Sequence, residues 1–106
     1  MAFSFKNAST LADTTRQLVY TAPASSEAIV ISFHLANLDA SNHRVTVEVY
    51  DSSATVYRNL GNELLIPTQN TLSWDGKIVL EENDALYITG DTNGDIEGTA
   101  HILEKT

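Results

Sequence analysis

The chain contains no cysteine among its 106 residues, so it can form neither a disulfide framework nor a zinc site with thiolate ligands. Basic residues are scarce: six lysines and arginines stand against fourteen aspartates and glutamates, for a formal net charge of −8. Such a chain repels phosphate backbones and anionic lipid surfaces, so we expect neither nucleic-acid nor membrane binding. Its stability must come from the packing of its own elements or from partner subunits.

Long hydrophobic runs and targeting segments are lacking as well. No stretch approaches the roughly 18 continuous apolar residues of a membrane-spanning helix, and residues 1–6 lack the basic and apolar regions of a signal peptide. We therefore expect the chain to be made and assembled in a cytoplasm. Its 42% of hydrophobic and 19% of charged residues are typical of one folded domain.

Short apolar runs that alternate with polar residues are what the sequence has instead. In residues 29–35 and again in residues 45–49, every second side chain is apolar. The two runs flank a polar loop, so residues 29–51 predict a β-hairpin with one buried face. The side chains expected on that face are Ile29, Ile31, Phe33, Leu35, Val45, Val47 and Val49.

Turn-forming residues separate the other runs. Asp75-Gly76 predicts a second hairpin, Asn93-Gly94 predicts a tight turn before a last strand, and the charged corner at residues 81–84 is expected to be exposed. No window combines helical periodicity with capping residues. The predicted fold class is therefore all-β, an antiparallel β-sandwich or jelly roll of about eight strands.

The first 15 residues differ from the rest of the chain. Phe3 and Phe5 lie on one side of a short extended piece, and a polar run without a sustained period follows. This pattern predicts an extended N-terminal arm over residues 1–15, ahead of a single β-sandwich domain over residues 16–106. Two large apolar rings on an arm need a partner, so Phe3 and Phe5 are candidate partner-binding residues.

One pattern is similar to a calcium loop. Asp91, Asn93 and Asp95 have the spacing at which alternate oxygen ligands converge on a hard cation. The sixth and twelfth positions of such a loop require glycine and glutamate, and this chain has Ile96 and Ile102 there. We therefore favour a plain polar turn.

Other polar residues show no catalytic pattern. His34, His43 and His101 lack the spacing of a metal or nucleophile motif and are expected to be exposed or partly packed. The carboxylates of residues 81–84 could suggest acid–base chemistry, but adjacent charges at a strand corner are usually only solvated. We predict no enzymatic activity, no catalytic residue, no metal site and no cofactor.

Two aromatic residues offer a further possibility. Trp74 and Tyr57 could form a flat platform on which a sugar stacks, although a lone tryptophan before Asp75-Gly76 is more often a cap on the core. Both residues are candidate partner-binding residues. A carbohydrate-binding module is thus an alternative function.

Several segments, taken together, resemble a family of small virion proteins of tailed bacteriophages. They are residues 45–53, 66–67, 78–88, 94–97 and 103–104, and the resemblance spans about residues 29–104. It implies a compact β-sandwich without enzymatic activity that decorates or cements the capsid, or sits at the neck or tail. The family pattern has Gly-Asp where this chain has Asn83-Asp84, and asparagine also tolerates turn geometry. The family shares no catalytic residues, so none is carried over.

The predicted function is that of a non-enzymatic bacteriophage structural protein, made in the host cytoplasm and located in the virion. A capsid decoration or cement protein is the first choice, and a neck or tail component is the alternative within the same particle. The expected partners are the capsid shell protein or other virion proteins, together with further copies of this chain in a homo-oligomer.

Overall fold

The protein is described by a computed structural model of residues 2–106, which form nine β-strands and no helix within that range. The strands are β1 (Phe3–Leu11), β2 (Gln17–Thr21), β3 (Glu27–Asn37), β4 (His43–Asp51), β5 (Val56–Ile66), β6 (Thr71–Trp74), β7 (Ile78–Leu80), β8 (Ala85–Gly90) and β9 (Ile96–Lys105). The predicted all-β class is confirmed. In the described part of the chain, no helix is long and apolar enough to cross a membrane.

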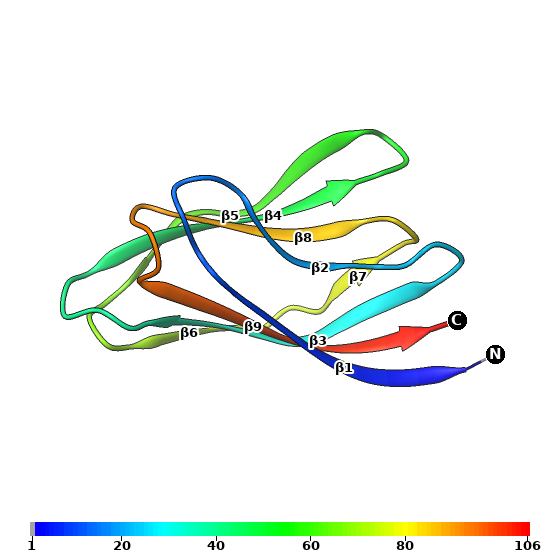
Figure 1. Cartoon of the computed structure of the whole chain (residues 1–106), viewed down its shortest axis with the longest axis horizontal. Coiled ribbons are helices and arrows are strands. Elements are labelled where there is room, and N and C mark those ends of the chain that lie inside the picture. Colours follow the sequence, from blue (N-terminus) through cyan, green and yellow to red (C-terminus); the bar gives the residue numbers. More distant parts are fainter. Residues whose placement is uncertain (1) are drawn as a thin grey trace.

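The strands form two antiparallel sheets that face each other (Figure 1). Sheet A has the order β1-β9-β3-β6, and β7 also pairs with β3; sheet B has the order β2-β8-β4-β5. Only the β4–β5 and β6–β7 connections stay within one sheet. The first and last strands of the chain therefore lie side by side, and the two ends meet at one end of the molecule.

The core lies between the sheets and follows from strict alternation along the strands. In β9, for example, every second residue from Ile96 to Glu104 is buried. Full burial of a leucine, isoleucine or phenylalanine side chain contributes about 1.5–3 kcal/mol. The largest fully buried side chains are Phe33, Leu35, Ile66, Leu80, Leu86, Ile88, Ile96, Ile102, Val30, Val45 and Val47.

Two predicted hairpins are wrong. β3 lies in sheet A and β4 in sheet B, and β6 and β7 both pair with β3 instead of with each other. The apolar faces of β3 and β4 cover each other across the core, so their loop carries the chain from one sheet to the other. Asn93-Gly94 likewise joins β8 of sheet B to β9 of sheet A, although Gly94 does adopt the predicted positive φ, at 79°.

A β-bulge in β3 decides which of its residues face the core. The pairing with β9 skips Ile31 between Val30 and Ser32. An extra residue shifts the alternation by one, so Val30 and Phe33 both point inward and are buried. Ile29 and Ile31 are each 38% exposed, so the prediction that they share a buried face with Phe33 is wrong.

The predicted N-terminal arm is largely a strand of the sandwich. β1 is an edge strand that pairs with β9 along its whole length, from Phe3↔Lys105 to Leu11↔Glu97. The structure therefore differs from the predicted division into an arm over residues 1–15 and a domain over residues 16–106. The polar run read as an arm belongs to an edge strand, whose open side tolerates polar residues. Met1 lies outside the described residues.

Candidate functional site

An exposed row of apolar side chains crosses the outer face of sheet A. Phe5 of β1 pairs with Leu103 of β9, Leu103 pairs with Ile29 of β3, and Ile29 pairs with Val79 of β7. We term these four residues the apolar row. Phe5 is 79% exposed and Val79 is 66% exposed, so both ends of the row are open to solvent.

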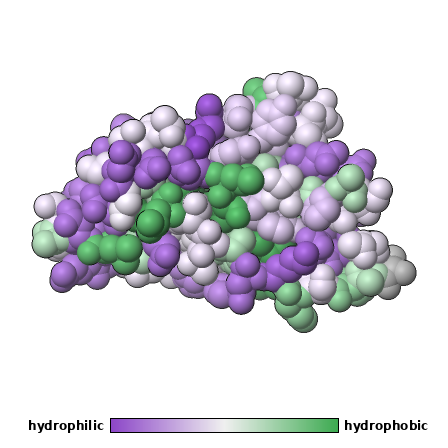
Figure 2. All heavy atoms as spheres, in the orientation of Figure 1, coloured by the Kyte–Doolittle hydropathy of each residue, from purple (hydrophilic) through white to green (hydrophobic). Residues whose placement is uncertain are grey.

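Phe3 extends this surface at the end of the sheet. It is 61% exposed and lies beside a shallow groove of about 220 Å³ that Ile29, Val79 and Leu103 also line. Lys105 and Glu27 line the groove too, so opposite charges accompany the apolar side chains. Figure 2 shows hydrophobic side chains reaching the lower right of the molecule, where β1 begins in Figure 1.

Exposure on this scale distinguishes the apolar row from ordinary surface. Single apolar side chains are common on protein surfaces, but contiguous ones more often mark an interaction site. The backbone register makes these four contiguous, because paired residues on one face of neighbouring strands bring their side chains together. The arrangement suits the binding of another macromolecule.

A polar cluster on the inner side holds β1 in place beneath this surface. The Tyr20 hydroxyl donates a hydrogen bond to Glu104, whose other carboxylate oxygen lies 3.3 Å from Lys6 Nζ of β1. The hydrogen bond from Tyr20 and the charge of Lys6 lower the pKa of the Glu104 carboxyl, although its burial acts in the opposite direction. Burial and the hydrogen bond to Glu104 raise the pKa of Tyr20.

Tyr57, a predicted partner-binding residue, lies in sheet B and its ring is partly covered. The Arg16 guanidinium carbon is 3.7 Å from the ring centroid, and Arg16 also makes a two-pronged hydrogen bond to Glu48 at 2.9 and 3.2 Å. The ring centroids of Tyr50 and Tyr87 lie 4.9 and 5.5 Å from that of Tyr57. The ring is thus part of a packed aromatic cluster.

Trp74, the other predicted partner-binding aromatic residue, ends β6 of sheet A. It pairs with Phe33, whose side chain faces the core, and its ring packs against the core's edge. A Cβ on Gly61 of β5 would lie 3.2 Å from Trp74 Cζ3, so this glycine leaves room for the indole. Trp74 and Tyr57 therefore do not form the sugar-stacking platform that the sequence suggested.

His43 is buried, contrary to the prediction that it lies exposed or partly packed in a loop. It begins β4 and is 7% exposed. Its Nε2 lies 2.8 Å from Asp39 Oδ2 and its Nδ1 lies 2.9 Å from Asp91 Oδ1. The hydrogen bond with Asp39, then that with Asp91, raises the pKa of His43 despite its burial, and Asp95 adds to the effect. The cluster joins the β3–β4 loop to the β8–β9 loop.

The calcium-loop residues Asp91, Asn93 and Asp95 make further hydrogen bonds to β4, to the β1–β2 loop and within their own loop. Asp91 Oδ2 accepts a hydrogen bond from Arg44 N, Asn93 Oδ1 accepts one from Thr14 N, and Asp95 Oδ2 accepts one from Thr92 Oγ1. Asp91 and Asp95 also approach the two ring nitrogens of His43, whereas Asn93 binds Thr14, so the three side chains do not converge on one point. This geometry offers fewer oxygens than the six to eight that calcium takes.

Asp39, His43 and Asp95 are near enough to hold a metal ion by distance alone, because their ligand atoms lie within 4.8 Å of one another. His43 Nε2 is already bound to Asp39 and lies 3.5 Å from Asp95 Oδ2. These groups satisfy one another as a charged cluster. We assign no metal to them.

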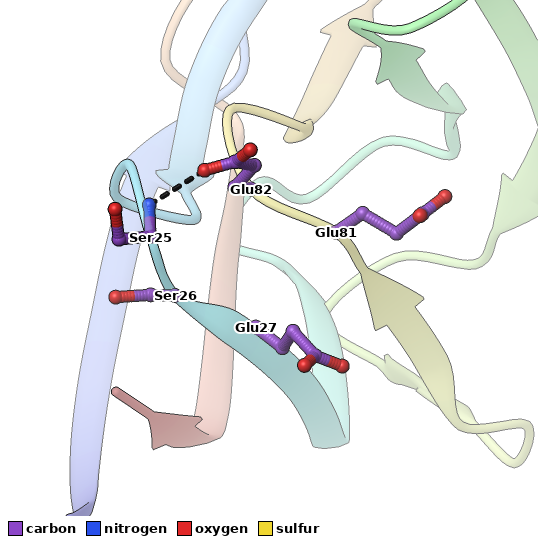
Figure 3. A pocket seen from close by; sticks show the side chains of 5 residues that line it. All are labelled: Ser25, Ser26, Glu27, Glu81 and Glu82. Atoms are coloured by element: carbon purple, nitrogen blue, oxygen red, sulfur yellow. Dashed lines mark hydrogen bonds between the residues drawn. The ribbon is translucent and has the colours of Figure 1, made fainter. Parts of the chain in front are cut away.

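The acidic corner lines a hollow of about 540 Å³ at the ends of the sheets (Figure 3). Glu82 points toward Ser25 and accepts a hydrogen bond of 2.6 Å from its backbone nitrogen, whereas Glu81 and Glu27 point away from Glu82. Three carboxylates that diverge in this way do not form a pair for acid–base catalysis.

Asp84 corrects the prediction that this whole corner is exposed. Its side chain is buried and accepts hydrogen bonds from Ser52 N at 2.9 Å, from Ser52 Oγ at 3.0 Å and from Glu81 N at 3.0 Å. The carboxylate therefore joins the β4–β5 turn to the turn before β8. Its role is structural.

Comparison with known proteins gives structural neighbours and no sequence family. No protein-family model matches the chain, and no curated protein matches it in sequence. A protein of the Bacillus endospore appendages, described as a novel family of disulfide-linked pili, is 14% identical with a TM-score of 0.61, over 99% of this chain and 87% of that one.

Phage capsid proteins are also among the neighbours. A protein of the acidic stable capsid of Helicobacter pylori bacteriophage KHP30 is 11% identical with a TM-score of 0.60, over 100% of this chain and 89% of that one. A pentameric capsid protein isolated from metagenomic phage sequences is 13% identical with a TM-score of 0.51, over 91% of this chain and 59% of that one. At these identities the likeness establishes the fold alone.

Part of the apolar surface was missed because the sequence was interpreted as alternating strands. Phe3 and Phe5 were singled out as exposed rings, whereas Ile29 was assigned to the core and Val79 was not singled out. The available signal was the pair of uninterrupted apolar runs at residues 28–31 and 78–80. An unbroken apolar run in a strand places apolar side chains on both faces, so one set must lie outside the core.

Proposed function

We propose that this chain is a non-enzymatic structural protein of a bacteriophage particle and, more finely, a capsid decoration or cement protein. It acts by binding, and the surface that binds is the outer face of sheet A. The observation that carries the proposal is the apolar row from Phe5 to Val79, which crosses four adjacent strands. Its partners are the capsid shell protein or other virion proteins.

The rest of the molecule is consistent with a role in binding. Among the described residues, the carboxylates of the acidic corner point apart from one another. Both ring nitrogens of the buried His43 are hydrogen-bonded to aspartates, so His43 is held as part of the structure. The strand orders β1-β9-β3-β6 in sheet A and β2-β8-β4-β5 in sheet B agree with the jelly-roll form of the sandwich. Jelly rolls are frequent in viral capsid and lectin domains, so the fold agrees with either role.

The similarity in structure to two phage capsid proteins supports the virion over other settings. The sequence resemblance to small tailed-phage virion proteins is independent support. The similarity to a protein of disulfide-linked pili points elsewhere, but this chain has no cysteine with which to make such links. A carbohydrate-binding module is less well supported, because Arg16 covers one face of Tyr57 and Trp74 packs on the core.

Counting this chain in purified particles tests the location. Quantitative mass spectrometry should find copy numbers in the hundreds if it decorates the capsid, whereas about a dozen copies or fewer indicate the neck or tail. Absence from particles would contradict the virion role altogether. The neck or tail component is the alternative that this measurement decides.

A matched pair of variants tests the surface. Val79→Asp introduces a charge at the open end of the apolar row, and Leu65→Asp introduces one at a residue of sheet B that is 48% exposed. We expect Val79→Asp to reduce binding to particles that lack the protein at least tenfold, while Leu65→Asp binds as the unchanged chain does. Equal binding by both variants would contradict the assignment of sheet A as the contact face.

A further inference from the structure

The edge strand β1 is unprotected against pairing with another strand. Sheet A ends at β1 on one side, whereas the short strands β6 and β7 share its other side. In sheet B, the edge strand β2 has five residues and a register shift, and β5 contains register shifts near Gly61. β1 instead runs for nine residues with no proline and an unbroken register. Long, regular, uncharged edges are the ones that pair with other chains.

The hydrogen bonds at the two ends of β1 fix which backbone groups are free. Ala2 exchanges two hydrogen bonds with Thr106, at 3.1 and 2.9 Å, and Ala12 N donates one to Ile96 O at 2.7 Å. Bonded pairs alternate along an antiparallel ladder, so the even-numbered residues of β1 bond to β9. The residues whose N–H and C=O groups point to the open edge are Phe3, Phe5, Asn7, Ser9 and Leu11.

The single charge on this strand is not free to protect the edge. Lys6 is the only charged residue of β1, and its ammonium lies 3.3 Å from the buried carboxylate of Glu104 on the inner side of the strand. Charged side chains, particularly lysine, are the usual means by which an edge strand repels another strand. Here the Lys6 side chain is 48% exposed, but its ammonium is held toward the inner face by Glu104 and does not extend across the open edge.

We propose that two copies of this chain associate through their β1 strands, which pair antiparallel about a two-fold axis at Asn7 and join the two sheets A into one. In this register Phe3 faces Leu11 of the other copy on the outer face, and Lys6 faces Ala8. The pairing therefore places apolar beside apolar and no like charge opposite a like charge. The occupant of the open edge is a second copy.

Other symmetric registers are less favourable. Centring the pair on Lys6 would set the two lysines directly opposite each other. Centring it on Ala8 or Phe5 would leave more of the nine-residue strand unpaired. Only the register centred on Asn7 uses the full strand. The dimer is expected whether or not the chain belongs to a virion, so its failure and that of the proposed function are separate.

A cysteine cross-link tests the register directly, because the chain has no native cysteine. In the proposed dimer Asn7 of one copy faces Asn7 of the other. Their Cα atoms would lie about 5.5 Å apart, as in any hydrogen-bonded antiparallel pair, and a disulfide can span that distance. Asn7→Cys should therefore form a dimer on oxidation. Ser9→Cys is the matched control, since its two copies would lie about four residues apart and cannot be bridged.

Light scattering during gel filtration tests the association without a cross-link. The unchanged full chain should give a dimer whose population rises with concentration, and Ser9→Pro should shift it to monomer, because the proline removes a donor at the open edge and none that bonds to β9. Ser9→Thr retains the donor and should remain dimeric. Melting temperatures of all variants establish that each is folded.

Three different results would contradict the proposed β1–β1 dimer. A monomer at every concentration, a dimer that persists in folded Ser9→Pro, or equal cross-linking of Asn7→Cys and Ser9→Cys would each refute the pairing. Because Asn7 also accepts a 2.7 Å hydrogen bond from His101, a small loss of stability in Asn7→Cys is expected and does not bear on the result.

Discussion

His43 has an acidic partner on each ring nitrogen, so its protonated form is stabilised in the folded state. The pKa of His43 is raised above its ordinary value of about 6.5. The resulting stabilisation is fully present below the unfolded-state pKa and is lost as pH rises through the folded-state pKa. We therefore expect the melting temperature of the protein to fall over that interval, relative to the variant His43→Gln.

The control for this prediction is another histidine. His34 is partly exposed and hydrogen-bonded only to Ser73 among described groups, so His34→Gln should retain the pH dependence. Thermal melts across the neutral range measure the difference between the two variants. A His43→Gln curve parallel to that of the unchanged protein would show that the acidic cluster does not favour the imidazolium.

Asp84 offers a second prediction at this scale, because its carboxylate accepts hydrogen bonds from Ser52 and Glu81 while buried. Asp84→Ala leaves those donors without their partner and should cost about 1–3 kcal/mol in the free energy of unfolding, measured by urea titration. Glu81→Ala removes an exposed side chain and should change that value by less than about 0.5 kcal/mol. Equal effects would contradict a structural role for Asp84.

Among the elements, β1 differs most from its prediction, because the sequence predicted an arm and the structure has a paired strand. Deleting residues 1–11 would expose β9, remove nine paired positions and break the Lys6 contact with Glu104. We expect a sharply lower melting temperature by circular dichroism. The matched variant Phe3→Ser/Phe5→Ser keeps the strand, and because its rings are already exposed, it should melt within a few degrees of the unchanged protein. If the deletion variant melted at the same temperature as the unchanged protein, β1 would be a detachable arm and not a structural strand.

The individual strands were largely predictable from the sequence because alternation and turn residues are local signals. Asp51, Ser52 and Ser53 are such turn residues, and β4 and β5 pair across them. Strand partners were not predictable, because periodicity indicates which side is apolar and not what covers it. The bulge at Ile31 was also beyond reach, since nothing local distinguishes a skipped residue from a paired one.

The candidate site was predictable only in part, because the sequence shows which side chains are apolar or aromatic but not which of them the fold brings together. Phe3 and Phe5 stood out because they precede a polar run, and both are exposed as expected. Whether they contact a partner stays a prediction. Tyr57 and Trp74 were paired by residue type alone, whereas the ring of Tyr57 packs with Tyr50 and Tyr87 and that of Trp74 packs against the core. His43 was misjudged because Asp91, the partner of its Nδ1, lies 48 residues away and only the folded chain brings the two together.

For the whole molecule, the charge balance has a measurable effect. The chain has fourteen acidic and six basic residues, and this excess of negative charge repels itself more in the compact state than in the unfolded chain. Added sodium chloride screens this repulsion, so the melting temperature should rise by a few degrees between low and physiological ionic strength. A fall would mean that ion pairs such as Arg16–Glu48 outweigh the net repulsion.

The hydrogen bonds between Ala2 and Thr106 place both ends of the described chain on neighbouring, oppositely directed strands. A force that pulls these two residues apart would load the β1–β9 bonds one after another, in the manner of a zipper, instead of all at once in shear. The fold should therefore yield at low force when held by its ends. It should resist far better when pulled along the strands, for example between residue 40 and residue 106, because β3 and β9 would then be loaded in shear from opposite ends. Tension from a growing or pressurised assembly would be tolerated only if it runs along the strands and does not act between the two chain ends.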